Sequence, residues 1–310
     1  MWMLIKHGLN PLKKYYKNTV KGDLFQAVLF LLPAIIILFT FSYYPILSIF
    51  RLSFFRWENL SPDRTFIGFE NYLKLIQNPR FWNSLKVTFS YTTIVTVSSI
   101  ALGLVLAITV NNKHLVLRSF WRSIYFLPVV TPTVAAAMVW RLLLDPSIGY
   151  INELLEIFHI QGPNWLADTQ WALPAVILLG IWRRVGVNLI LYLAALQAIP
   201  TVYYESAKVD GANPLKQFWH ITVPLLKPTT TMLVILGIID SFLVFDQVMV
   251  LTRGGPVNST EVIGWYMYNN AFNFFKMGYG AAISVVIFAI IAFLTLIQWR
   301  FVGFGAAGQE

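Results

Sequence analysis

Six apolar segments, each of about 20 residues or more, constrain this chain more than any other feature. A helix rises about 1.5 Å per residue, so segments of this length match the roughly 30 Å of hydrocarbon in a bilayer. The segments are Leu24–Ile46, Val87–Val110, Ser123–Leu144, Trp171–Leu196, Thr229–Leu251 and Ala281–Phe301. Because lipid offers the backbone no hydrogen-bond partners, the sequence predicts an all-α, polytopic membrane protein with six transmembrane helices.

The low content of charged residues also favours a bilayer environment. Of the 310 residues, 57% are hydrophobic and 12% are charged, against about 25% charged residues in soluble domains. A formal net charge of +9 would suggest nucleic acid in a soluble protein. In a membrane protein it indicates cationic loops beside anionic headgroups, so no nucleic-acid partner is expected. The chain has no cysteine, which excludes a disulfide framework and thiolate chemistry.

Charges around the spans predict the orientation. The leader, residues 1–23, carries five lysines against the single acid Asp23, which favours a cytoplasmic N-terminus. Six spans return the tail, residues 304–310, to the same side, with a membrane domain over residues 24–303. The five cations between Arg51 and Arg80 weaken this argument, so the charge rule supports the orientation without deciding it.

A polar segment, Tyr204–Pro224, interrupts the apolar pattern, and parity places it in the cytoplasm. It contains Glu-Ser-Ala, then Asp-Gly-Ala, then Ile-Thr-Val-Pro, and it resembles the EAA loop of the membrane subunits of ABC importers. The resemblance implies that this loop docks onto a separate ATPase. Ser206 stands where that motif has alanine, and serine is small enough for docking. The residues implied in coupling are Glu205, Ser206, Ala207, Asp210, Gly211, Ala212, Ile221 and Pro224.

The local chemistry of this segment suits a docking element. Glu205, Ala207, Lys208 and Ala212 fit on a short helix, and Gly211 allows a sharp turn. A second helix is expected to begin at Asn213-Pro214, because proline suits the first turn of a helix. The alternative is an ordinary amphipathic connector at the membrane surface.

The resemblance extends over residues 24–303. It is carried by Ala194–Pro200 (AALQAIP), by Phe66–Tyr72 (FIGFENY), by Leu127-Pro128, and by Val244–Val248 (VFDQV) followed by Leu251–Pro256 (LTRGGP). These segments look like the maltose-type carbohydrate permeases, in particular the first of their two membrane subunits.

That resemblance implies a set of partners and a location. The partners are a second, homologous permease subunit, two ABC ATPase subunits that bind ATP and Mg, an extracytoplasmic solute-binding protein and a small sugar substrate. The location is a bacterial or archaeal inner membrane, crossed several times, with both termini in the cytoplasm. The implied mechanism is alternating access driven by closure of the ATPases.

No catalytic or metal site is expected in this chain. It contains no G-x-x-x-x-G-K-[ST], so no loop here can hold ATP phosphates in the P-loop manner. Its histidines, His7, His114, His159 and His220, show no metal-ligand spacing. We therefore expect no cofactor on this chain and ATP hydrolysis by another polypeptide.

Charged residues within the spans are the second functional signal. Arg183 and Arg184 fall near the middle of the fourth span and Asp240 near the middle of the fifth, with Asp246 about 9 Å further along. Such charges cost a few kcal/mol in a bilayer unless they face a polar cavity or a counter-charge. On regular helices Arg184 shares a face with Asn188, and Asp240 shares one with Gln247. Asp240 and Asp246 lie about 120° apart unless the helix is broken.

Two interpretations of these charges remain open. An Arg–Asp pair could only hold two spans together, or the side chains could line a polar path whose groups bind sugar hydroxyls. The resemblance favours the path. The residues expected along it are Arg183, Arg184, Val187, Asn188, Asp240, Ser241, Val244 and Asp246.

Other functions remain possible from the sequence. An ion-coupled secondary transporter would use intramembrane acids and arginines, but would not explain the EAA-like loop. A membrane scaffold would leave the charges unexplained. An importer of the same family could carry glycerol phosphate or a glycosylated compatible solute, and the sequence does not identify the solute.

Overall fold

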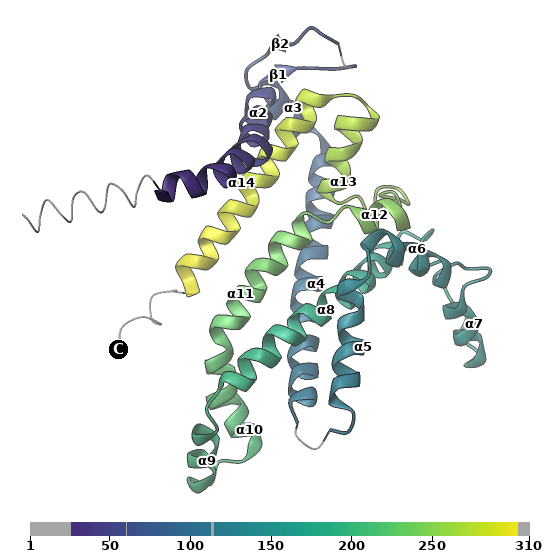
Figure 1. The fold of residues 1–310 in the computed structure, drawn as a ribbon. Helices are drawn as coiled ribbons and strands as arrows, with labels where there is room; N and C mark the ends of the chain where they lie inside the picture. Colours follow the sequence, from purple (N-terminus) through teal and green to yellow (C-terminus); the bar gives the residue numbers. More distant parts are fainter. Residues whose placement is uncertain (1–25, 60, 113–114, 303–310) are drawn as a thin grey trace, which may run out of the picture.

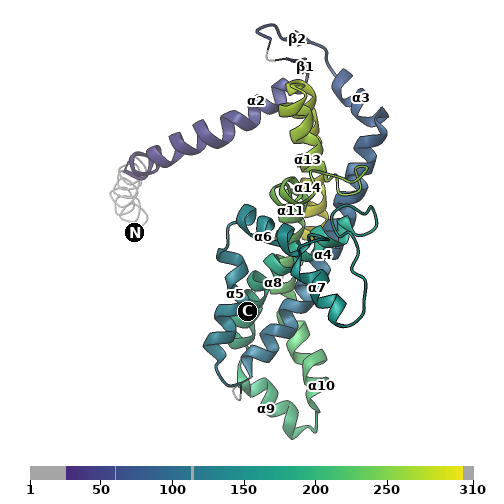
Figure 2. The ribbon, with the colours of Figure 1, turned by 90° about the vertical axis from the view of Figure 1, so that its right-hand side faces the viewer.

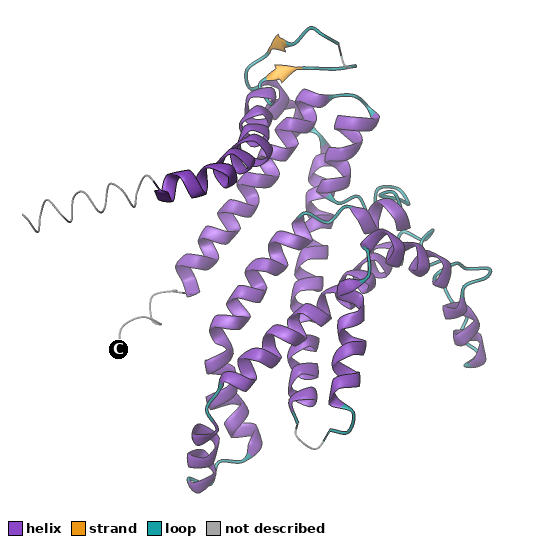
Figure 3. Ribbon diagram, in the orientation of Figure 1, coloured by secondary structure: helices purple, strands orange, loops and turns teal. Residues whose placement is uncertain are grey.

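The computed structural model describes residues 26–59, 61–112 and 115–302. The predicted cytoplasmic leader and tail, and His7 and His114, lie outside the described residues. Helices dominate the described chain, as predicted, and the described strands form one short antiparallel pair, β1 (Phe55–Arg56) with β2 (Thr65–Phe66) (Figure 3). The prediction of an all-α class is confirmed.

Five of the described helices are long and apolar enough to cross a membrane, and a bent pair adds a sixth. Three of the five are single elements: α4 (Pro79–Asn111), α8 (Ala172–Ala198) and α14 (Met277–Val302). The first helix, Gln26–Leu52, contains η1 (Phe39–Tyr43) and α2 (Tyr44–Leu52). The helix Pro214–Phe242 joins α10 (Pro214–Gln217), η2 (Phe218–Thr222) and α11 (Val223–Phe242). Figure 1 shows α4, α5, α8 and α11 side by side in the body of the molecule.

Shorter elements connect these helices. They are α3 (Glu70–Gln77), α7 (Tyr150–Ile157), α9 (Thr201–Val209), α12 (Asp246–Leu251), α13 (Ile263–Tyr268) and η3 (Asn269–Asn273). The helices α9 and α10 form one end of the molecule, far from the β-hairpin (Figures 1 and 2).

The third predicted span is bent rather than straight. It consists of α5 (Arg118–Val130) and α6 (Thr133–Leu143), which meet at 101°. Thr131, at the bend, has an extended backbone with ψ of 126°. The following Pro132 explains the bend, because proline lacks an N–H and disfavours a helical residue before it.

The fifth predicted span ends earlier than expected. The prediction of one helix over Thr229–Leu251 is wrong, because α11 ends at Phe242 and α12 begins at Asp246. Asp240 therefore lies in the last turn of α11, and its predicted shared face with Gln247 does not exist. The broken segment packs closely against α13: a Cβ at Gly264 would lie 2.8 Å from the Val244 carbonyl oxygen, so glycine lets the two backbones approach.

Close packing of α4 on α8 forms the centre of the molecule. A Cβ at Gly103 would lie 2.6 Å from that of Asn188, and one at Gly180 would lie 2.3 Å from the Tyr91 hydroxyl. Small residues of this kind let membrane helices approach closely enough for van der Waals contact to hold them. The position of α8 against α4 is thereby set by side-chain size.

The first helix lies apart from this body. No part of the most apolar window of Gln26–Leu52 is buried inside the chain, and its N-terminal half projects away from the other helices (Figures 1 and 2). Its C-terminal part contacts α14, where Phe50 meets Phe288 edge to face at 5.8 Å between ring centroids.

Candidate functional site

A polar cavity of about 380 Å³ lies where both helix breaks meet α4 and α8. Val129 and Thr133 line it from either side of the α5–α6 bend, and Leu243 lines it from the α11–α12 break. Non-helical backbone at membrane depth is tolerated where it faces such a cavity. Seven of the eight residues expected along the path line it, namely Arg183, Arg184, Val187, Asp240, Ser241, Val244 and Asp246.

One ion pair crosses the cavity wall. The Arg184 guanidinium of α8 contacts the Asp240 carboxylate of α11. The Arg184 side chain is 11% exposed and that of Asp240 is 66% exposed, so the carboxylate remains accessible from the cavity. The pair both holds two helices together and lines the cavity, so the two interpretations of these charges are compatible.

The other two charged side chains of the cavity are unpaired. Among the described residues, neither Arg183 nor Asp246 forms an ion pair or side-chain hydrogen bond, and the Nε of Arg183 is buried without a partner. Two cations and two anions thus balance, and hydrogen-bonding groups of both kinds remain unpaired: donors at Arg183 and the Nε of Arg184, and acceptors at Asp246 and the Oε1 of Gln247. A solute with hydroxyl groups can satisfy both, because a hydroxyl donates and accepts.

Asn188 does not belong to this cavity. Its side chain is fully buried and donates from Nδ2 to the Ser99 hydroxyl of α4 at 3.0 Å. The structure thus gives it a place in the α4–α8 contact. Its spacing from Arg184 put it on the same side of α8, but packing against Gly103 buries that part of the helix.

Several cavity residues, Gln247, Tyr91 and Phe245 among them, were not in the set expected along the path. The buried Gln247 donates to the Tyr91 hydroxyl, while its own Oε1 has no partner. Phe245 forms an aromatic wall that stacks on Trp265 at 5.8 Å between ring centroids. Only the polar Gln247 within an apolar run was a usable signal, because Tyr91 and Phe245 resemble ordinary membrane-helix residues.

The Tyr204–Pro224 segment folds as two helices joined by a tight turn. Glu205, Ala207 and Lys208 lie on α9 as predicted, whereas Ala212, expected on the same helix, lies in the turn. Gly211 has φ of +75°, which glycine adopts without steric cost. The side chain of Asn213 then accepts from the Lys216 N–H at 2.8 Å and caps α10.

The second half of the segment is part of the candidate membrane-spanning helix Pro214–Phe242. Pro214 is the first residue of α10, as predicted, and Ile221 and Pro224 belong to the continuous helix that ends at Phe242. A hydrogen bond of 2.9 Å between Tyr204 and Thr222 ties α9 to this helix. The same continuous helix carries Asp240 near its other end.

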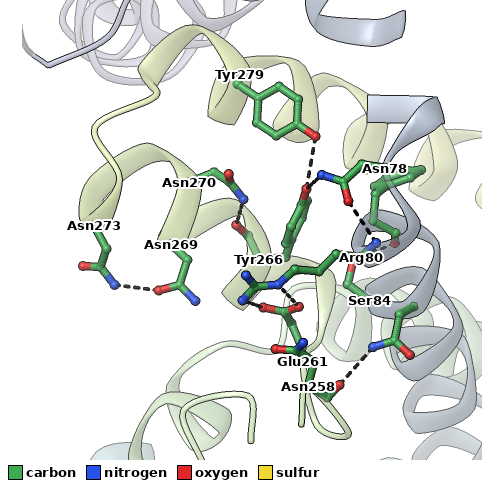
Figure 4. Close-up of polar contacts among 12 residues, drawn as sticks. Asn78, Arg80, Ser84, Asn258, Glu261, Tyr266, Asn269, Asn270, Asn273 and Tyr279 are labelled. Atoms are coloured by element: carbon green, nitrogen blue, oxygen red, sulfur yellow. Dashed lines mark hydrogen bonds and ion pairs between the residues drawn. The ribbon is translucent and has the colours of Figure 1, made fainter. Parts of the chain in front are cut away.

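A second polar cluster lies at the N-terminal end of α4, around Asn78 and Arg80 (Figure 4). Arg80 binds Glu261 through Nε to Oε2 at 2.7 Å and Nη2 to Oε1 at 2.6 Å, and Glu261 is fully buried. Asn78 donates to the Tyr266 hydroxyl at 3.1 Å. Burial raises the pKa of the Tyr266 phenol, so this group stays neutral. The cluster fastens the segment before α13 to α4.

No group of three or more His, Cys, Asp or Glu side chains suited to a metal ion occurs in the part of the chain that the structure describes. The expectation that the chain carries no cofactor remains a prediction.

The chain is similar in sequence to known membrane transport proteins. Residues 99–302 match the family described as binding-protein-dependent transport system inner membrane component. The chain is 37% identical to the probable ABC transporter permease YurN of Bacillus subtilis, over 88% of this chain and 94% of that protein. It is 33% identical to the arabinooligosaccharide permease AraP of Bacillus subtilis (96% and 97% covered). It is 34% identical to the trehalose/maltose permease MalF of Thermococcus litoralis (88% and 92% covered).

Solved structures show the same fold. A bacterial ABC transporter for import of the acidic polysaccharide alginate matches with a TM-score of 0.80 and 24% identity, over 94% of this chain and 99% of that chain. A second alginate transporter structure, in complex with a pentasaccharide-bound periplasmic protein, matches with a TM-score of 0.78 and 25% identity over the same shares.

Proposed function

Because the chain belongs to the family of binding-protein-dependent transport system inner membrane components, we propose that it is the permease subunit of an ATP-driven importer for a sugar or sugar-like solute. The cavity carries this proposal: Arg183, Arg184, Asp240 and Asp246 meet there although they come from three helices, α8, α11 and α12. The names of relatives, which include arabinooligosaccharide, trehalose/maltose and sulfoquinovosyl glycerol permeases, support sugars as the solute class.

The chemistry of the cavity suits a neutral, hydroxyl-rich solute. Guanidinium groups donate to vicinal hydroxyls and carboxylates accept from them. Phe245 offers an apolar ring to the C–H face of a sugar. Because the four charges sum to zero, an uncharged solute leaves no charge unbalanced, whereas an anion would face Asp246 as well as Arg183.

We assign ATP coupling to α9 and the turn that follows it. Their surface is exposed, and Glu205, Ser206, Asp210 and Gly211 are among its exposed residues. A separate ABC ATPase, with its ATP and Mg, is the partner that this surface fits. Closure of the ATPases would move α9, and the Tyr204–Thr222 contact would carry that movement into α11.

We expect two further partners, a second permease subunit and a solute-binding protein, because one chain forms only half of the translocation pathway. The cavity is bounded by one chain, and the unburied helix Gln26–Leu52 leaves a surface for a second, homologous permease subunit. A solute-binding protein would deliver the sugar from outside. With the bent pair counted as one span, six crossings would leave both termini on one side of an inner membrane, and we assign that side to the cytoplasm.

The test is uptake into vesicles that hold the complete complex. Uptake of a labelled oligosaccharide should require ATP on the α9 side and the binding protein on the other, and should persist when the proton gradient is collapsed. Uptake driven by the proton gradient without ATP would support a secondary transporter instead.

A further inference from the structure

Two arginines beside the C-terminal end of the first helix have no anionic partner. Five cations lie between residues 51 and 80, and three of them pair with carboxylates. The paired three are Arg56 and Lys74, which contact Glu70 at 2.8 and 2.7 Å, and Arg80, which binds Glu261. Within the described ranges, Arg51 and Arg64 form no ion pair and no side-chain hydrogen bond, so their charges are not balanced by the chain.

These two arginines line one small pocket of about 170 Å³ between α2 and the β-hairpin. The pocket is lined by Tyr44, Ser48, Arg51, Leu52, Phe55 and Arg64. None of these six residues is an acid. The hydroxyl groups of Tyr44 and Ser48 form no hydrogen bond with another described residue, so both can donate into the pocket. The lining thus combines positive charge with free hydrogen-bond donors.

The short hairpin brings the two arginines to this pocket. Phe55 of β1 pairs with Phe66 of β2, and their rings meet edge to face at 5.4 Å between centroids. Next to β2, the Cζ of Arg64 lies 4.2 Å from the centroid of the Trp57 ring. The Cζ of Arg51 lies 5.9 Å from the centroid of the Phe55 ring. Cation–π contacts of this kind hold the guanidinium groups while their N–H donors stay free.

A phosphate group is the anion that this pocket suits. Like charges that share a pocket repel each other, and an anion between them offsets that cost. Guanidinium groups donate paired hydrogen bonds to phosphate oxygens, and the Tyr44 and Ser48 hydroxyls can add two more. A zwitterionic headgroup would bring a further cation to a pocket that already has two, so an anionic phosphodiester fits better.

The position of the pocket favours a lipid as the source of the phosphate. Ser48 lies four residues, or about 6 Å, before Leu52, where the first candidate span ends. No part of the most apolar window of this span is buried inside the chain, so acyl chains can lie along it. The hairpin and α2 lie at the end of the molecule opposite α9 and α10 (Figures 1 and 2). This end is therefore the outer side if α9 faces the cytoplasm.

We infer that the pocket of Arg51 and Arg64 binds the phosphate of an anionic phospholipid such as phosphatidylglycerol in the outer leaflet, with the acyl chains beside the helix Gln26–Leu52. The lipid ties the hairpin to the bilayer surface. This inference goes beyond the proposed function, because it concerns a lipid site and holds for any solute.

Native mass spectrometry of the purified complete complex tests the lipid site. The complex is stripped of lipid in detergent and titrated with phosphatidylglycerol. Arg51→Gln with Arg64→Gln should remove one tightly bound phosphatidylglycerol. Rebinding of that molecule should need roughly 25-fold more lipid, because each basic residue near an anionic membrane surface contributes about fivefold. Arg51→Lys with Arg64→Lys keeps both charges and should keep part of the affinity, since lysine lacks the paired donors.

A matched control removes the same charge from the same segment. Arg56 and Lys74 are 47% and 53% exposed and both contact Glu70. Arg56→Gln with Lys74→Gln should therefore keep the bound phosphatidylglycerol. Both double variants change exposed residues, so their melting temperatures should stay close to that of the unchanged complex. Equal loss of lipid from the two double variants would show a general surface attraction and overturn the proposal.

Two further titrations identify the source of the phosphate. Phosphatidylcholine, which has the same phosphodiester but no net charge, should bind more weakly than phosphatidylglycerol and respond less to the double variant. Variant-sensitive binding of inorganic phosphate without that of phosphatidylglycerol would assign the pocket to free phosphate and overturn the lipid. An unchanged complex without variant-sensitive phosphatidylglycerol would show that another group, such as a carboxylate of the second permease subunit, fills the pocket, and would also overturn the proposal. No readout uses sugar uptake, so failure of the lipid site leaves the proposed function standing.

Discussion

Arg184, in the middle of α8, pairs with Asp240 in the last turn of α11, immediately before that helix breaks beside the cavity. The contact links the helix that forms the centre of the molecule to the helix that continues from the α9 turn. The Asp240 carboxylate can bind solute, and its contact with Arg184 depends on the position of α11.

Asp240→Ala is expected to abolish sugar uptake. The change removes an acceptor from the cavity and leaves Arg184, which is 11% exposed, without its counter-charge. Assembly of the complex and ATP hydrolysis in the absence of substrate should persist, because α9 is untouched. Vesicle uptake, subunit stoichiometry and the rate of ATP hydrolysis without substrate measure these three outcomes, with Asp168→Asn in the loop before α8 as a control. Normal uptake by the Asp240→Ala complex would contradict the assignment of Asp240 to the solute path.

Gly180→Ala should destabilise the α4–α8 contact by about 1–3 kcal/mol, as overpacking of a filled site does. The new methyl group would lie 2.3 Å from the Tyr91 hydroxyl oxygen. Adding Tyr91→Phe removes that oxygen, so the double variant should recover part of the lost thermal stability. Melting of the purified protein in detergent checks this, and strictly additive losses would show that the two residues do not clash.

Glu205→Lys should weaken retention of the ATPase with little effect on the stability of this chain. The residue is exposed on α9, where surface substitutions usually change stability by less than about 0.5 kcal/mol. Co-purification of the ATPase gives the readout, with Glu153→Lys on α7 as a matched exposed acid. Equal ATPase yields from both variants would argue against α9 as the coupling surface.

Glu261→Ala should cost about 3 kcal/mol or somewhat less. Removing one partner of a buried pair leaves the other charge uncompensated, but Arg80 is 39% exposed and recovers some hydration. Arg80→Met with Glu261→Met should be milder than Glu261→Ala, because it leaves no unpaired charge. Thermal unfolding curves of the two variants decide the order, and the reverse order would show that the pair itself supplies the stability.

Sequence reasoning identified the cavity residues better than the helix ends. Intramembrane charge is costly wherever it occurs, so Arg183, Arg184 and Asp240 stood out without any structure. The end of α11 did not, because residues 243–251 are mostly apolar and the contact between Val244 and Gly264 at the break is visible only in the structure. The bend at Pro132 had a local signal, which hydropathy over a window of about 20 residues averages away.

The sequence by itself determined the features that depend on local chemistry, namely the long apolar helices and the turn after α9. Apolar segment length gave the membrane-spanning helices, and Gly211, Asn213 and Pro214 specified the turn after α9 through backbone freedom, capping and fixed φ. The tertiary structure alone decided which side chains meet. Arg184 and Asp240 are 56 positions apart, and Tyr91 and Gln247 are 156 apart. Such pairs depend on how closely α4, α8, α11 and α12 approach, and side-chain volumes across several helices set that approach together.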